Sequence, residues 1–252
     1  MKKKTIFSLI LIVMLSGIAH TGAQAQRRAF RHENLPQHDE KPYHFGFSLG
    51  LNKMGFALKP VENLHALEGQ PLAGAPDPET MYTVLPGPQN GFHIGIVSNL
   101  KLTRQLDLRF VPTLSFGDRQ IIYGISEDGQ QRDLAQDIES TFLDFPIHFK
   151  YKSVRFFNTR AYVIGGAKYS HDLASAEDRD DAGQVILARI ARNDVYLELG
   201  IGFDYYFQFF KFSTELKGSL GLTNLIRPEN TVYTNSIDRL NSKIIMLSFL
   251  FE

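Results

Sequence analysis

The stretch from Val195 to Leu220 constrains the fold of this chain more than any other feature of the sequence. From Val195 to Phe207 every second residue is apolar, and most residues between them are polar or small. After an aromatic turn the apolar residues alternate with Lys, Ser and Glu as far as Leu220. This period of two predicts two strands with one apolar face each. Strands of soluble sandwiches usually have about five or six residues, whereas a tilted strand needs about 9 to 11 to cross a bilayer. We therefore interpret the pair as a membrane hairpin.

The same alternation returns along the rest of the chain and predicts eight strands. Pro112 interrupts the third of them and indicates a bulge, because proline cannot donate to a strand ladder. Gly165 and Gly166 leave the phase of another strand open. The expected strands cover residues 43–52, 92–100, 106–116, 141–152, 161–169, 195–207, 210–220 and 245–251.

The connections between these strands alternate strictly between long and short. Long outer loops, short inner turns and an even strand count are typical of outer-membrane barrels. A sheet in lipid must also close, because an open edge would leave backbone groups unpaired. We predict an all-β fold over residues 43–252, an eight-stranded antiparallel transmembrane β-barrel with four long extracellular loops and short periplasmic turns. The long loops are expected at 57–89, 118–139, 172–193 and 223–241, with helical turns near 62–68 and 185–191, and the short turns at 101–104, 153–158 and near 208.

The amino terminus has the features of an export signal. Three lysines precede a short apolar run, and Ala23-Gln24-Ala25 forms a small-x-small cleavage pattern. We predict a signal peptide over residues 1–25 that is removed after Ala25; a retained anchor helix is the alternative, but the apolar run is short for a span. Residues 26–42 are polar and aperiodic, so we expect a mobile periplasmic leader. His32 and His38 in this segment could be metal ligands, but their spacing does not support a site.

Composition excludes several classes of function. The chain has 27 basic and 27 acidic side chains, so net charge gives no reason to expect a nucleic-acid partner. It has no cysteine, and therefore no disulfide, thiolate metal site or cysteine nucleophile. His171 and Asp172 are placed near the outer rim, where a barrel enzyme would need them, but they lack an evident third partner. We predict no catalytic, cofactor-binding or metal site, no cofactor, no small-molecule substrate and no enzyme activity.

The inward faces of the predicted strands carry charges of both signs. An eight-stranded barrel has a lumen that its own side chains just fill. Salt bridges across such a lumen would close it, so a conducting pore is not expected. The aromatic residues near strand ends are expected to form girdles at the two membrane interfaces: Tyr43, Tyr123, Tyr151, Tyr169, Tyr205, Phe207, Phe209 and Phe210. The inward charges are Asp107, Arg109, Asp144, His148, Lys150, Glu198, Asp204, Glu215 and Lys217.

Several stretches also resemble a known family. The runs 141–152 (TFLDFPIHFKYK), 162–170 (YVIGGAKYS), 198–206 (ELGIGFDYY) and 211–217 (KFSTELK), with the closing 247–252 (LSFLFE), resemble the PorT (SprT) outer-membrane proteins over essentially all of the mature chain. The resemblance implies a small outer-membrane barrel of the type IX secretion and gliding motility machinery, needed for the export of cargo with C-terminal sorting domains. It implies other secretion subunits as partners and no catalytic residue.

Two functions of different class follow. The first is an accessory component of the secretion machine, embedded in outer-membrane lipid, with an assembly or gating role. The second is a free-standing small barrel that acts as an adhesin, a binder or a brace of the envelope through its outer loops. A lipid-facing wall with polar patches would favour the first, and a uniformly apolar wall would favour the second.

Overall fold

A computed structural model of the chain describes residues 33–64, 76, 80–127, 130–175 and 186–252. The predicted signal peptide and His32 lie outside the described residues. Among those described, no helix has the length and apolar character needed to cross a membrane.

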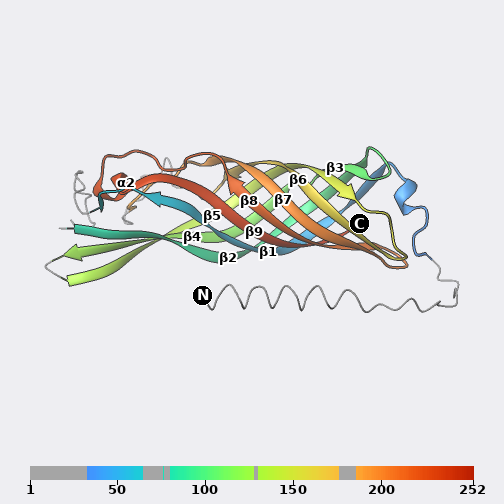
Figure 1. The fold of residues 1–252 in the computed structure, drawn as a ribbon, viewed down its shortest axis with the longest axis horizontal. Coiled ribbons are helices and arrows are strands. Elements are labelled where there is room, and N and C mark those ends of the chain that lie inside the picture. Colours follow the sequence, from blue (N-terminus) through green and yellow to red (C-terminus); the bar gives the residue numbers. More distant parts are fainter. Residues whose placement is uncertain (1–32, 65–75, 77–79, 128–129, 176–185) are drawn as a thin grey trace, which may run out of the picture. The chain divides into compact units, whose positions relative to one another are not determined.

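The described strands form one antiparallel sheet that closes on itself (Figure 1). Strands that follow one another in the chain pair with each other, except β3 and β4, which share one position between β2 and β5, and β1 pairs with both β2 and β9 to complete the barrel. A short helix, η1, precedes the barrel, and α2 precedes its last strand. The elements are η1 (His38–Glu40), β1 (Tyr43–Pro60), β2 (Thr80–Lys101), β3 (Leu106–Phe110), β4 (Thr113–Glu127), β5 (Gln130–Lys152), β6 (Thr159–Asp172), β7 (Asn193–Tyr206), β8 (Lys211–Gly221), α2 (Val232–Asn235) and β9 (Ile237–Phe251).

The nine strands occupy the eight positions that the sequence predicts. The predicted third strand is split at Val111 and Pro112 into β3 and β4, and both halves pair with β2 on one side and β5 on the other. The interruption lies where proline indicates a bulge. Even there the Ile96 amide donates a 3.1 Å hydrogen bond to the Pro112 carbonyl, so the wall stays connected.

Two of the predicted long loops are wrong in extent. Residues 80–89 and 130–139 belong to β2 and β5, and with β4 they form a three-stranded sheet that extends beyond the part of β2 that β1 pairs with (Figure 1). Only residues 128–129 separate β4 from β5. Pro86 and Pro88 lie within this part of β2. They fit because residues 80–88 pair only with β4 in the described structure, and an edge strand needs no donor on its free side.

The other two long loops are close to their predicted positions. They cover residues 173–192 and 222–236, and β9 begins at Ile237, earlier than expected. Residues 186–191 are not helical, contrary to prediction, and Ile190 instead forms a β-bridge with Ile226. The predicted helical turn at 62–68 lies partly outside the described residues, and 62–64 are not in an α-helix. All three short turns are confirmed, at 102–105, 153–158 and 207–210.

The predicted alternation of faces is confirmed. Along β7, Leu197, Leu199 and Ile201 are exposed on the outer wall, whereas Glu198 and Asp204 are buried inside. The sequence left open which residues of β6 face the lumen. Tyr162 and Ile164 point inward and Val163 points outward. One predicted girdle residue is wrong: Tyr123 is fully buried inside the barrel.

The narrow lumen requires glycine at a few inward positions. A Cβ at Gly50 would overlap the carbonyl oxygen of Leu247, and one at Gly166 would overlap that of Ile147. Only a residue without a side chain allows the neighbouring strands to approach this closely.

Candidate functional site

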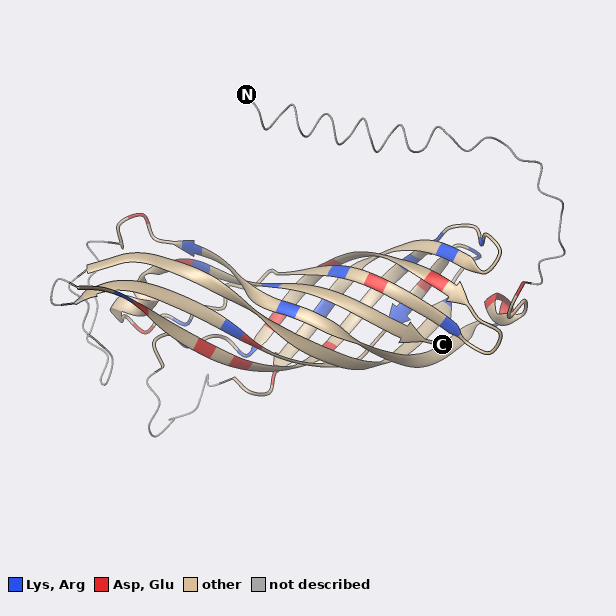
Figure 2. Ribbon diagram, turned by 90° about the horizontal axis from the view of Figure 1, so that it is seen from below, with Lys and Arg blue, Asp and Glu red and all other residues tan. Residues whose placement is uncertain are grey.

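The sequence pattern predicts a lumen filled by its own charges, and charged residues of both signs recur along the strands of the barrel (Figure 2). In the periplasmic part of the lumen their side chains form ion pairs. Arg109 on β3 lies 2.9 Å from Glu215 on β8 and 3.5 Å from Glu252. Three strands separate β3 from β8 on either side of the barrel, so this pair spans the full diameter. Lys150 pairs with Asp204 at 2.8 Å at the same end. Side chains from opposite walls therefore meet across the lumen.

A second cluster centres on the Glu198 carboxylate. His148 lies 2.6 Å from it, and Lys217 and Lys168 approach to 3.5 and 3.6 Å. Lys168 also approaches Asp144 to 3.4 Å. Such buried carboxylates are stable in charged form only because several cations and hydroxyls surround them. Every inward charge that we predicted is brought into this network.

Cations and carboxylates balance inside the barrel. The buried cations of the described residues are Arg109, Arg119, Lys150, Lys152, Arg160, Lys168, Lys211 and Lys217. The carboxylates are Asp107, Asp144, Asp172, Asp194, Glu198, Asp204, Glu215 and Glu252. The lumen as a whole therefore favours neither anions nor cations.

Arg119 marks the upper limit of the charged region. Its guanidinium lies between the rings of Phe56 and Phe142, at 4.9 and 4.8 Å from their centroids. It donates hydrogen bonds to Ser140 at 2.9 Å, Ser242 at 3.1 Å and Asp172 at 3.1 Å. This one side chain of β4 therefore contacts β1, β5, β6 and β9, and it closes the lumen at this level.

Above Arg119 the interior becomes apolar. The inward residues of the strands meet side chains from the described loop residues 186–192 and 222–236, so these residues lie in the mouth of the barrel. We call this cluster the apolar plug. Its buried members are Phe56, Met81, Val84, Ile121, Tyr123, Ile125, Leu187, Ile190, Leu225, Tyr233, Ile237 and Leu240.

Hydrogen bonds fix the plug loops to the wall. The Gln136 side chain of β5 accepts from the Ala188 amide at 3.0 Å and donates to the Ala188 carbonyl at 3.1 Å. The Leu225 amide donates to the Leu240 carbonyl of β9 at 2.8 Å. The Ala191 amide donates to the Leu225 carbonyl, also at 2.8 Å. The two loops therefore bind each other as well as the barrel.

The residues considered for chemistry do not assemble into a site. Asp172 points inward to Arg119, whereas His171 points outward and contacts Asn193 at 2.6 Å. Adjacent residues of a strand face opposite ways, so the two cannot act on one substrate. His38 stacks on His44 at 4.2 Å, and no group of metal-ligating side chains occurs among the described residues.

Comparison with known proteins agrees with this architecture. Residues 23–227 match the family described as the outer membrane protein beta-barrel domain. The chain belongs to this family. As a member of the outer-membrane β-barrel proteins, it is located in the outer membrane.

Two solved structures are similar to this chain. The outer membrane protein OprG from Pseudomonas aeruginosa is 12% identical, with a TM-score of 0.40 over 82% of this chain and 93% of that one. The N-terminal β-barrel domain of OprF from the same organism is 14% identical, with a TM-score of 0.28 over 81% and 96%. No curated protein matches the sequence.

The described part of the leader binds the periplasmic end of this outer-membrane barrel, in contrast to the mobile segment that we expected. Asp39 forms an ion pair with Arg160 and accepts a 2.9 Å hydrogen bond from the Tyr206 hydroxyl. Burial acts to raise the pKa of the Asp39 carboxyl, but hydrogen bonds from His38, Tyr206 and Arg160 and the Arg160 charge hold that pKa well below its ordinary value.

Arg155 adds to this attachment from the turn between β5 and β6. Its guanidinium donates to the Asn34 carbonyl and lies 3.8 Å from the centroid of the Tyr206 ring. The Lys101 side chain reaches the Asp39 carbonyl. Residues 33–42 thus have partners on several parts of the barrel rim.

Sequence analysis missed two kinds of lumen residue. Arg119 was expected in the long loop at 118–139 but lies in β4, and Tyr162 lies in the strand whose phase was open. Both are central to the network, and Tyr162 donates a 2.9 Å hydrogen bond to Glu215. The plug residues of the loops carry no periodic signal. Apolar residues such as Leu187 and Leu225 in otherwise polar loops were the available sign that these loops are buried.

Proposed function

We propose that this protein is a non-catalytic, non-conducting barrel that serves as an accessory component of protein export across the outer membrane. The observation that carries the proposal is the closed lumen. Ion pairs cross its periplasmic part and an apolar plug fills its outer part. A barrel filled in this way acts through its outer surfaces.

The type IX secretion role rests on the resemblance to PorT proteins. Its partners would be other secretion subunits together with outer-membrane lipid. The periplasmic rim offers a surface for such subunits, because residues 33–42 are bound there and the adjacent turns expose aromatic side chains. Phe156 and Phe209 on these turns are 75% and 88% exposed. The same aromatic residues also suit the inner membrane interface.

A secretion assay tests the proposal directly. In a strain that lacks the gene, cargo with C-terminal sorting domains should accumulate in the periplasm, and the wild-type gene should restore its release. Normal release of cargo would refute the export role. In planar bilayers the purified barrel should show no stable conductance, and steady ohmic channels would refute the closed lumen.

A free-standing barrel is the second candidate, and two observations favour it. The outward residues in the membrane-spanning part of the strands, which we call the apolar belt, are almost uniformly apolar, as on β1 with Phe45, Phe47 and Leu49. The three-stranded extension of β2, β4 and β5 also has free edges in the described structure. If secretion is normal, cells that produce a variant without residues 82–87 and 120–137 of this extension should lose the surface binding that the intact protein supports. Unchanged binding would refute this candidate.

A further inference from the structure

The lipid-facing wall carries a shallow groove that crosses the strands from β5 to β9. Its volume is about 660 Å³, and its lining is almost wholly apolar. Gly165 and Gly218 in the lining have no side chain, whereas Leu199 and Ile245 are paired with them on the next strands. The Leu199 side chain lies 3.1 Å from the place that a Cβ of Gly165 would take, so the open part of the groove is at Gly218. A Cβ at Gly218 would meet no heavy atom within 4 Å, so the space above this residue is open.

The sheet register shows where the groove leads. Residues directly paired across successive strands form one row on the outer face, and because the strands are tilted this row runs obliquely across the membrane. It begins low on β5, close to the periplasmic turn, and ends on β1 at the upper edge of the apolar belt. The row consists of Phe149, Gly165, Leu199, Gly218, Ile245 and Lys53.

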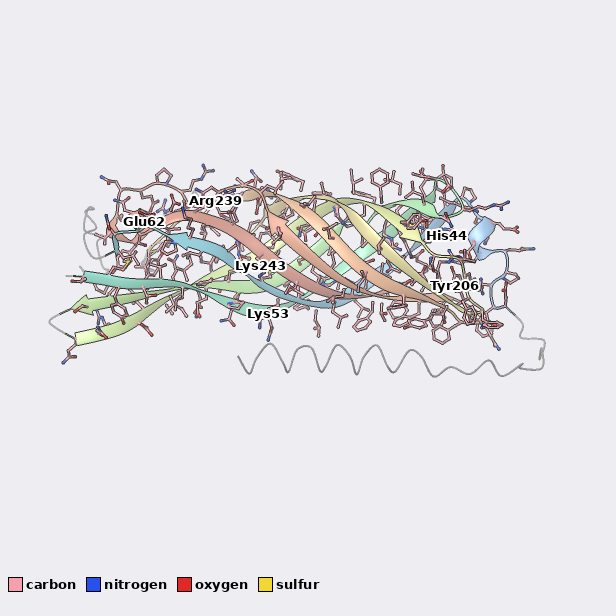
Figure 3. The ribbon with its side chains drawn as sticks, viewed as in Figure 1. His44, Lys53, Glu62, Tyr206, Arg239 and Lys243 are labelled. Carbon is pink, nitrogen blue, oxygen red and sulfur yellow. The ribbon has the colours of Figure 1, made fainter. Side chains whose placement is uncertain are left out.

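Two lysines stand at the upper end of this row (Figure 3). Lys53 pairs in register with Ile245, and Lys243 lies two residues before Ile245 on the same face of β9, closer to its outer end. Diagonal neighbours of this kind are about 7–8 Å apart. Both are exposed, and each is the first polar outward residue above the belt on its strand.

These two lysines have no ionic partner among the described residues. Nearby Lys59 differs, because it forms a 2.7 Å ion pair with Asp238. Arg239, which is exposed and also has no ion pair in the described structure, extends the positive surface further along β9. An ammonium group at the boundary of the hydrocarbon region that lacks a protein anion is placed to bind a lipid anion.

The wall beyond β2 has the reverse charge. On β4 and β5 the first charged outward residues above the belt are Asp118 and Glu139, which are directly paired and both exposed. Asp137, two residues before Glu139 and closer to the outer end of β5, is also exposed. An anionic lipid would be repelled from this side, so the rim is polarised and the groove meets its positive side.

We propose that the groove and the lysine pair together bind one anionic, phosphate-bearing lipid of the outer leaflet. The phosphate lies between the ammonium groups of Lys53 and Lys243, and an acyl chain lies in the groove over Gly218. The apolar lining excludes water from the chain, while the two lysines select lipids that carry phosphate over neutral lipids.

Native mass spectrometry of the intact barrel in neutral detergent tests this site, with lipid A that retains both phosphates as the titrated probe. The double variant Lys53→Gln/Lys243→Gln should bind about 10- to 30-fold more weakly. Gly218→Leu changes no charge but fills the groove, and should weaken binding several-fold. Lys41→Gln removes an exposed lysine from the periplasmic end and should have no effect.

The form of the lipid separates the two parts of the site. Dephosphorylated lipid A should bind the wild type as weakly as intact lipid A binds the double lysine variant. Equal binding of both lipids by the wild type would overturn the role of the lysines. The variants must keep the folded gel mobility of the wild type. If lipid A then binds both the double lysine variant and Gly218→Leu as tightly as it binds the wild type, the lipid site is overturned and the groove is left for a protein partner.

Discussion

The two halves of the lumen are filled by different chemistry from different parts of the chain. In the charged half the groups that meet come mainly from strands, as Arg109 and Glu215 do. In the apolar plug the strands meet residues from loops, among them Leu187 and Leu225. Strands fix the position of a side chain, which a charge pair needs for good geometry. Burial of apolar area is non-directional, and loops can provide it.

The largest effect should follow from breaking the charged half at its centre. Glu198→Gln would remove the carboxylate that His148, Lys168 and Lys217 share, leaving Lys168 with Asp144 alone and Lys217 with the more distant Glu215, and should lower the free energy of unfolding by about 3–5 kcal/mol. Urea unfolding in detergent, followed by the gel mobility of the folded form, measures this. Glu139→Gln removes an exposed carboxylate and should change little. A cost below about 1 kcal/mol at Glu198 would mean that water already solvates the network.

A smaller effect is expected in the apolar plug. Leu225 is 1% exposed, and Leu225→Ala should cost about 2–3 kcal/mol, near the lower end for buried leucines because a loop can partly collapse into the space. Hydrogen exchange should become faster at the Ala191 amide, which donates its hydrogen bond to the Leu225 carbonyl. Exchange of the β7 and β8 amides should stay unchanged. Leu222→Ala, at a position that is 57% exposed, is the matched control. Faster exchange in both halves would show that they are one cooperative unit.

The smallest effect should be at the leader. Because the pKa of Asp39 is lowered in the folded protein, its stabilising contribution is present at neutral pH and is lost progressively as pH falls below about 4, the ordinary value for the carboxyl. Asp39→Asn should release residues 33–42 at neutral pH, seen as faster exchange of the Lys41 amide, which donates to His38. Glu40→Gln, an exposed neighbour, should not. Neither variant should alter the lumen.

Sequence alternation was sufficient for the barrel and for the identity of most lumen charges. Period two assigns each residue of β7 and β8 to a face without knowledge of its neighbours. It does not show which charges meet, because the partners of Arg109 depend on closure of the whole barrel. The extension at residues 80–89 was missed because prolines are excluded from central strands but not from edges. The plug was missed because its loop residues have no period.

Inward and outward glycines affect the circumference of the barrel differently. At Gly50 and Gly166 the neighbouring backbone occupies the place of a side chain, so even alanine would push two strands apart. At Gly218 the wall accepts a larger residue. Attempts to widen this protein into a pore should therefore begin with the inward glycines, since they set how tightly the sheet can be rolled, and emptying the lumen of charges alone would leave a tube of the same radius.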